Sequence, residues 1–435
     1  MVNHAAHEAA PTRHGMPHRL RILLAVLCGV SVANIYYAQP LLGQIGADLS
    51  LPAAGLGLVV ALAQLGYLAG LIVLVPLSDL VDRRKLIALQ IGAAATGMML
   101  VAFSTTGLQL LIGITVAGAF SVVVQVIVAY AAAISHPEER GTNIGVITSG
   151  VVVGIILART VAGLVADLAG WRAVYSGSAV TSLLIAAIAL TLLPKDVRAC
   201  SGQGGATRLR PKTGNYMRAV GAVVTLTTTN RVFRTRALIT LFLFASFGAL
   251  WSGMALPLSE EPWRLSTTQI GLFGIAGLVG ALGAISAGRW ADEGKAQRVT
   301  GLSLIVLVLS WVLSAQATHS LVLLTVGVIA LDFAVQAVHV TSQNLIVAHA
   351  PESSGRIIGS YMVFYSLGSA IGAISTTAVF HAAGWSGASA VGGGYAAAAL
   401  IVWIVDLTRT SRARNQPGRK DGPAAEFSHT NWDSE

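Results

Sequence analysis

The sequence predicts an all-α polytopic membrane protein whose twelve transmembrane helices form two pseudo-symmetric six-helix bundles. Three observations predict this fold: the composition, the number of long apolar segments and an internal repeat. Of the 435 residues, 54% are hydrophobic and only 11% are charged, whereas soluble domains carry about 25% charged residues. This deficit extends through the chain, so it excludes a soluble enzyme and a disordered protein. Two cysteines cannot form a disulfide framework.

A helix needs about 20 mostly apolar residues to cross the hydrocarbon core of a bilayer. Windows of that kind predict six spans in the first half of the chain, at residues 21–45, 54–75, 86–104, 107–134, 142–166 and 171–193. Six more follow at residues 236–258, 268–288, 298–316, 319–349, 356–380 and 387–408. No small-residue cleavage site follows the first apolar run, so we expect an uncleaved first span.

The polar segments divide the chain into a tail at 1–20, a bundle at 21–193, a basic linker at 194–235, a second bundle at 236–410 and a tail at 411–435. Within the linker, residues 215–231 have an apolar stripe with basic ends, which is typical of a helix on the membrane surface; a solvated linker is the alternative. Four histidines in the first tail match no closed metal site in spacing. We therefore expect no metal and no cofactor.

Most lysines and arginines fall in the loops of one side, including the pair Arg83 and Arg84, the linker and the second tail. The positive-inside rule then predicts that both termini are cytoplasmic. This topology explains the net charge of +9 without a nucleic acid partner. We expect a multi-pass protein of the plasma membrane, most simply the inner membrane of a bacterium.

Several loop and helix residues recur in the second half at a nearly constant offset. The recurring pairs are Pro137 and Pro351, Glu138 and Glu352, Gly141 and Gly355, Gly145 and Gly359, Gly154 and Gly368, Gly170 and Gly384, Trp171 and Trp385, and Asp79 and Asp292. These pairs indicate a duplicated six-helix unit. Two parallel six-helix repeats joined by a long loop are the plan of a rocker-type secondary transporter.

The whole chain between its tails resembles the major facilitator superfamily. The segment 76–85 is similar to the family's signature between spans two and three, although Val75 and Asp82 replace two of its glycines; the second copy, at 288–295, keeps the leading Gly. The fifth span resembles the signature of the family's drug–proton antiporters, with Arg159 in place of its proline. The stretch 34–40 is similar to that of bacterial efflux permeases.

This resemblance implies transport by alternating access, with an efflux-type subgroup as the nearest match. It also implies that Asp79 and Asp292 act as conformational latches, with Arg83 and Arg84 as partners. In the fifth span, it places Gly154, Arg159 and Gly163 on a glycine-spaced face with a gating or packing role.

Only Arg159 and Asp332 lie clearly within predicted spans as charged residues. An ionisable group there costs about 2.5 to 3.5 kcal/mol, which makes each a functional candidate. Asp332 is placed near the midplane, and Gln336, His339 and Gln343 share its helix face. We expect Asp332 to carry the coupling proton, with His339 as a relay; the alternative is a buried acid satisfied by neighbouring helices.

Arg159 is placed roughly 12 Å from Asp332 in depth, so the sequence does not predict direct pairing. We favour a gating or packing role for Arg159 over contact with an anionic substrate. The candidates for substrate contact are polar and aromatic residues of cavity-lining spans: Asn34, Tyr37, Gln39, Gln125, Tyr130, Trp251, Gln336, His339, Tyr361 and Tyr365. Each of them is equally suited to an interhelical hydrogen bond or an interfacial position.

The function expected from these observations is a secondary active transporter, not an enzyme. The leading hypothesis is proton-coupled export of a small organic molecule by a monomer in the lipid bilayer. An uptake symporter or a facilitator of the same fold remains the alternative, and a membrane-embedded enzyme or sensor is the alternative from another class. We find no metal-ligand pair, nucleophile elbow or nucleotide-binding glycine loop.

Overall fold

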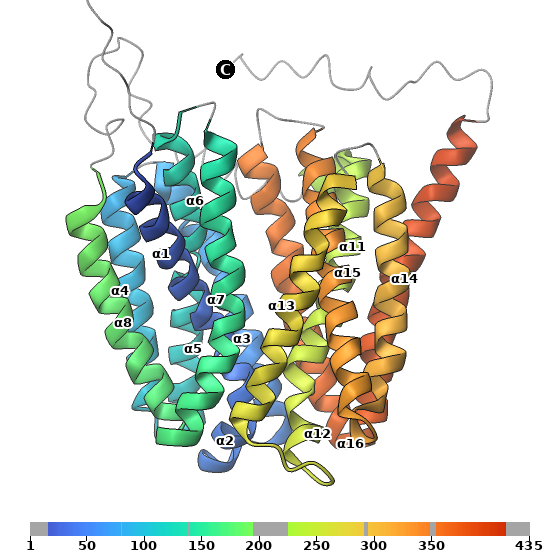
Figure 1. Cartoon of the computed structure of the whole chain (residues 1–435), viewed down its shortest axis with the longest axis horizontal. Coiled ribbons are helices and arrows are strands. Elements are labelled where there is room, and N and C mark those ends of the chain that lie inside the picture. Colours follow the sequence, from blue (N-terminus) through green and yellow to red (C-terminus); the bar gives the residue numbers. More distant parts are fainter. Residues whose placement is uncertain are drawn as a thin grey trace, which may run out of the picture.

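The computed structural model of the chain describes residues 16–79, 81–136, 139–194, 225–290, 295–348 and 354–414. In these segments the regular structure is helical, with no strand. Figure 1 shows two bundles side by side, one from the first half of the chain and one from the second. The fold class predicted from the sequence is therefore confirmed.

The first bundle follows the predicted spans closely. Its helices are α1 (His18–Tyr36), α2 (Ala38–Asp48), α3 (Ala53–Val73), the short 3-10 helix η1 (Pro76–Asp79), α4 (Arg83–Ala102), α5 (Gly107–Ser121), α6 (Val123–Ile134), α7 (Arg140–Ala169) and α8 (Trp171–Leu192). Local sequence explains several boundaries. The carboxylate of Asp82 accepts from the backbone N–H of Arg84 and caps α4, while Thr106 caps α5.

The second bundle repeats the plan. Its helices are α11 (Arg231–Gly253), α12 (Ala255–Ser259), α13 (Thr267–Trp290), α14 (Ala296–Ser314), the 3-10 helix η3 (Ala315–Thr318), α15 (Leu321–Ala348) and α16 (Ser354–Arg414). Gly384, with φ +62°, breaks α16 into two spans, and the matching Gly170, with φ +83°, separates α7 from α8. A positive φ favours glycine at both positions. The described residues thus contain eleven apolar helices, the last of which holds two spans.

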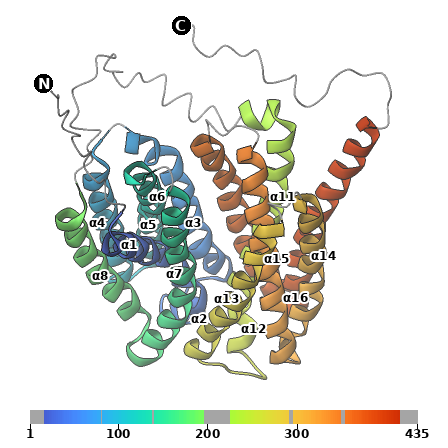
Figure 2. The same ribbon diagram turned by 45° about the horizontal axis from the view of Figure 1, so that its top comes forward.

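The two bundles meet mainly along α3 with α16 and α7 with α13, and α2 also contacts α11, α12 and α13. In Figures 1 and 2, α2 and α12 lie at one end of the molecule, and the start of α1 and the end of α16 lie at the other. We call these the α2–α12 end and the basic end. The second is named for its basic residues: Arg83, Arg140 and Arg231 each begin a helix there, and Lys295 immediately precedes α14.

One prediction about buried charges is wrong. α11 begins at Arg231, earlier than the predicted start of the seventh span, so Arg236 lies more than one turn inside the helix. Its side chain is only 2% exposed. Its guanidinium donates to Gln297 Oε1 at 2.9 Å and to Thr300 Oγ1 at 3.1 Å. Arg236 is therefore a third buried charge, and neutral acceptors satisfy it.

Several predicted features lie outside the described residues. They are Asp292, the two tails up to residue 15 and from residue 415, and most of the linker, including most of the predicted surface helix. The predicted boundaries of the bundles and linker remain predictions.

Candidate functional site

Arg159 of α7 lies at the centre of the molecule, where both bundles contribute to its surroundings. It is 3% exposed, and its Nε donates to Gln39 Oε1 at 2.8 Å. Its guanidinium carbon lies 3.7 Å from the ring centroid of Trp251 on α11 and 5.0 Å from that of Tyr36 on α1. Phe247 of α11 adds a third ring at 5.9 Å. Aromatic faces attract a cation, so these rings offset part of the cost of burying the charge.

Asp332 of α15 lies beside the same tryptophan. It is 5% exposed and interacts electrostatically with Arg159, although no salt bridge within 4 Å joins the two in the described part of the chain. Neither Asp332 Oδ2 nor Trp251 Nε1 has a hydrogen bond of ordinary geometry. Trp251 is therefore a neighbour of both an arginine from one bundle and an aspartate from the other.

The sequence did not predict direct pairing of Arg159 and Asp332, and within the described segments the two side chains interact electrostatically without a salt bridge within 4 Å. Their backbones do lie at different levels of α13, where Gly271 and Gly274 face Arg159 and Gly277 and Gly280 face Asp332. Six residues of helix separate Gly274 from Gly280, which corresponds to about 9 Å. The arginine side chain extends to the indole, and the indole in turn lies beside Asp332, so side chains rather than backbones bring the two charges near one another.

A second polar group surrounds His339, further along α15. Its Nδ1 lies 3.0 Å from the hydroxyl of Tyr361, and its Nε2 lies 3.2 Å from Nε2 of Gln343. The imidazole also contacts the rings of Phe244 and Tyr365. Tyr365 in turn shares a hydrogen bond of 2.7 Å with Tyr36, so this aromatic group connects His339 to the surroundings of Arg159.

The other predicted substrate contacts divide into two groups. Gln39, Trp251 and Tyr365 belong to the central region just described, and Gln336 is partly buried on α15 between Asp332 and His339. The other four candidates make hydrogen bonds inside the first bundle. Asn34 and Tyr37 accept from the hydroxyl of Ser178 of α8, Gln125 donates to Tyr67, and Tyr130 donates to the carbonyl of Pro194.

The α2–α12 end is held by polar contacts that cross between the bundles. The Asp167 carboxylate of α7 accepts from the backbone N–H groups of Thr267 and Thr268, at 3.2 and 2.7 Å, and from the hydroxyl of Thr267. Gln44 of α2 donates to the same hydroxyl at 2.8 Å. An acid of the first bundle thus caps the N-terminus of α13, where its charge also meets the positive end of the helix.

The predicted gating residues occupy different contacts. Gly163 faces the backbone of Thr267 across the bundle interface, whereas Gly154 packs on Gly29 within the first bundle. At the basic end, Asp79 ends η1, and Arg83 donates to the carbonyl of Ser78 at 3.2 Å. The backbone N–H of Arg84 donates to the capping carboxylate of Asp82.

Sequence reasoning missed Tyr36, Phe247 and Asp167 as site residues. Tyr36 precedes the break between α1 and α2, and its position inside an aromatic and amide-rich stretch was the available signal. Asp167 gave little signal, because an acid near a predicted helix end is common on a membrane protein surface.

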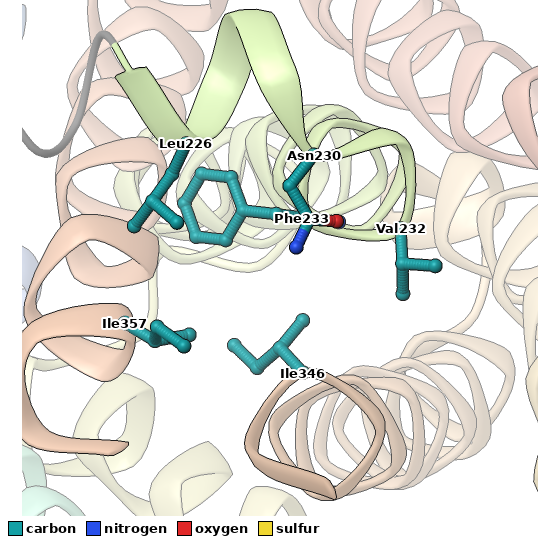
Figure 3. A pocket seen from close by; sticks show the side chains of 6 residues that line it. All are labelled: Leu226, Asn230, Val232, Phe233, Ile346 and Ile357. Atoms are coloured by element: carbon teal, nitrogen blue, oxygen red, sulfur yellow. The ribbon is translucent and has the colours of Figure 1, made fainter. Parts of the chain in front are cut away.

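Two small cavities lie near these residues. One is lined by Gln39, Pro40, Arg159, Trp251, Met254, Ala255 and Ile270, from both bundles. The other lies at the basic end and is lined almost wholly by apolar side chains of α11, α15, α16 and the preceding turn, as Figure 3 shows. Since a charged side chain, Arg159, lines only the first, it is the better candidate for substrate binding. No cluster of metal ligands occurs in the described segments.

Comparisons with known proteins agree with this architecture. A family model described as Major Facilitator Superfamily matches residues 23–373 and residues 236–432. The chain is 40% identical over 391 residues to the uncharacterized transporter YgaY of Escherichia coli O157:H7, covering 90% of this chain and 96% of that protein. It is 25% identical over 413 residues to the inner membrane transport protein YnfM of Escherichia coli strain K12, covering 92% and 93%.

Among solved structures, a bacterial homologue of the human lysosomal transporter Spinster, in an inward-facing and unoccupied conformation, superposes with a TM-score of 0.74. The sequences are 15% identical, and the match covers 92% of this chain and 98% of that one. This likeness supports the fold.

Proposed function

Because the chain belongs to the major facilitator superfamily and is a multi-pass membrane protein, we propose that it is a proton-coupled secondary transporter that exports a small organic molecule. One observation carries the proposal: a buried arginine from the first bundle and a buried aspartate from the second lie beside the same residue, Trp251. Charges inside a membrane protein are expensive and mark transport pathways. A site built from both bundles changes whenever the bundles move relative to one another.

Asp332 is the proposed proton carrier. Its carboxylate lies in the interior of the protein beside Arg159 and the indole N–H of Trp251. Burial disfavours the charged form of a carboxylate, whereas a neighbouring cation favours it, so a movement of the neighbours couples proton binding to conformational change. His339, which lies two turns further along α15 among Tyr361, Gln343 and Tyr365, is the proposed relay toward the basic end.

The proposed cycle alternates between closure at the α2–α12 end and closure at the basic end. Asp167, Gln44 and Gly163 support the first closed state through their contacts with Thr267. Asp79 and Asp292, with Arg83 and Arg84, are the proposed latches of the second state, and Gly154 and Arg159 are proposed to transmit the motion along α7. Such contacts must break as one end opens.

The basic end is proposed to face the cytoplasm, with both termini on that side, because positive residues gather there. The inner membrane of a bacterium is the proposed location, supported by the name of the relative YnfM. We propose a monomer, since each chain contains both bundles and the complete central site.

The proposal is tested with purified protein in liposomes that enclose a pH-sensitive dye, under an imposed pH gradient. Sugars, amino acids, organic anions and cationic drugs are added in turn to the wild type and to Asp332→Asn. We expect one class to cause proton movement in the wild type, with loss of the signal in the variant. The exposed carboxylate of Asp48, which pairs with Arg172 inside the first bundle, provides the control Asp48→Asn.

Transport without proton movement would identify a facilitator instead. Retention of full proton-driven transport by Asp332→Asn at normal expression would remove Asp332 from the mechanism. The sign of the proton movement separates export by antiport from uptake by symport.

A further inference from the structure

The central site contains two buried polar groups of opposite charge. In the part of the chain that the structure describes, neither Arg159 Nη2 nor Asp332 Oδ2 has a hydrogen bond of ordinary geometry, and the indole N–H of Trp251 is the neighbouring donor of Asp332. Leaving such a group unpaired in the interior is unfavourable, more so when it is charged. Among the described residues, no salt bridge within 4 Å joins the two side chains, so each keeps an atom to which a ligand can bind.

Both groups lie beside Trp251. The guanidinium carbon lies 3.7 Å from the ring centroid of this residue. Asp332 Oδ2 and Cζ2 of Trp251 both lie within 3.0 Å of the point where a β-carbon would stand on Gly277, so the carboxylate is next to the same indole. A cationic side chain and an anionic side chain, one from each bundle, therefore share one aromatic neighbour. A small molecule that carries an anionic and a cationic group a few bonds apart complements such a pair of charges.

The cavity beside Arg159 indicates what the rest of that molecule is like. Apart from Gln39, whose side-chain oxygen already accepts from Arg159, its remaining walls are the indole of Trp251 and the side chains of Pro40, Met254, Ala255 and Ile270. These walls are apolar, so they favour an apolar body. The cavity measures about 10 Å³, the space of one water molecule. Because its walls come from both bundles, it widens when the bundles separate.

We infer that the substrate is a small zwitterion with an apolar body, such as an apolar amino acid, whose carboxylate binds Arg159 and whose ammonium group binds Asp332. This inference rests on the proposed transport function and names its substrate class. The charged or titratable groups that face Asp332 are Arg159 of α7 and Tyr36 of α1. An ammonium group on Asp332 occupies the place of the proton, so substrate and proton exclude one another there, as exchange requires.

The test uses the purified full-length chain and three matched sets of ligands. L-alanine, L-leucine and L-phenylalanine are each compared with the N-acetyl derivative, which lacks the cation, and with the amide, which lacks the anion. We expect at least one zwitterion to bind about tenfold or more tightly than both of its derivatives, because each charge makes a charge-assisted hydrogen bond. Isothermal titration calorimetry measures the affinities.

Two variants assign the charges to residues. Arg159→Gln is expected to weaken zwitterion binding to the level of the amide, and Asp332→Asn to weaken it to the level of the N-acetyl derivative. Asp48→Asn is the control and is expected to retain wild-type affinities, because Asp48 lies at the α2–α12 end in contact with Trp171 and Arg172.

Failure of all three zwitterions to bind overturns the inference, as does equal affinity for a zwitterion and either of its derivatives. If another class of compound is then exported with a proton signal that Asp332→Asn abolishes, the proposed function stands without the zwitterion. If a zwitterion binds as expected but moves no protons, the binding site stands and the proton-coupled function fails.

Discussion

Replacing Asp167 by alanine is expected to open the α2–α12 end more often. In the structure, this carboxylate accepts three hydrogen bonds from the first two residues of α13, and all three cross between the bundles. They exist only while the α2–α12 end is closed. Their loss therefore destabilises the closed state and leaves the open state nearly unchanged.

The size of the effect follows from the chemistry of helix caps. Removing an N-cap side chain costs about 0.5 to 2 kcal/mol, and the interaction of an acid with the helix dipole contributes about 0.3 to 1 kcal/mol. Asp167 is exposed, so screening by water and salt keeps the total in the lower part of this range. A change of about 1 to 1.4 kcal/mol shifts the ratio of closed to open molecules about five- to tenfold.

Distance measurements between spin labels provide the assay. One label replaces Thr105, in the loop between α4 and α5, and the other replaces His319, just before α15, in a chain whose two cysteines have been changed to serine. Both sites are exposed and lie in different bundles at the α2–α12 end. Electron–electron double resonance then reports the fraction of molecules with a long distance, which we expect to increase in Asp167→Ala.

Asp48→Ala is the matched control. It also removes an acid from the α2–α12 end, but the partners of Asp48, Trp171 and Arg172, belong to its own bundle. An unchanged distance distribution in Asp167→Ala, or an equal change in both variants, would refute the idea that Asp167 holds the bundles together.

Three further predictions concern the centre and the basic end. Gly277→Ala places a β-carbon against a carboxylate oxygen and the indole, so we expect overpacking of about 1 to 3 kcal/mol and a lower thermal unfolding temperature, whereas Gly177→Ala, which meets no atom within 4 Å, should not lower it. Tyr36→Phe removes a hydrogen bond of 2.7 Å between the bundles, worth about 1 kcal/mol, so a label pair at the α2–α12 end should show about a fivefold shift toward the open state. Asp79→Ala is expected to abolish transport while the protein still inserts in the membrane; unchanged turnover in liposomes would exclude a latch there.

Most of the fold could be predicted from the sequence because hydropathy and turn residues act locally. The break at Gly384 illustrates this: its repeat partner Gly170 already indicated a boundary between two spans, and both adopt positive φ. The start of α11 was harder to place. Arg236 was predicted to begin the seventh span, yet it lies more than one turn inside α11, where Gln297 and Thr300, from a helix far along the chain, allow it to be buried.

The site was predictable in its charged members and not in their arrangement. Arg159 and Asp332 stand out because ionisable residues are rare in apolar spans. That they approach one another depends on Trp251, on the reach of the arginine side chain and on glycines of a third helix, none of which hydropathy reports. The cap formed by Asp167 was hidden for a similar reason, since it joins helices of different bundles.

These distant contacts suggest how the two ends and the centre are coupled. α7 carries Gly154 against α1, Arg159 at the central site, and Gly163 and Asp167 against the start of α13. α13 in turn faces Arg159 near its start and Asp332 further along. A movement of α13 away from α7 therefore breaks the Asp167 cap and changes the separation of the two central charges in one step. Binding of a ligand between those charges then biases the same movement, because the ligand holds together residues of both bundles.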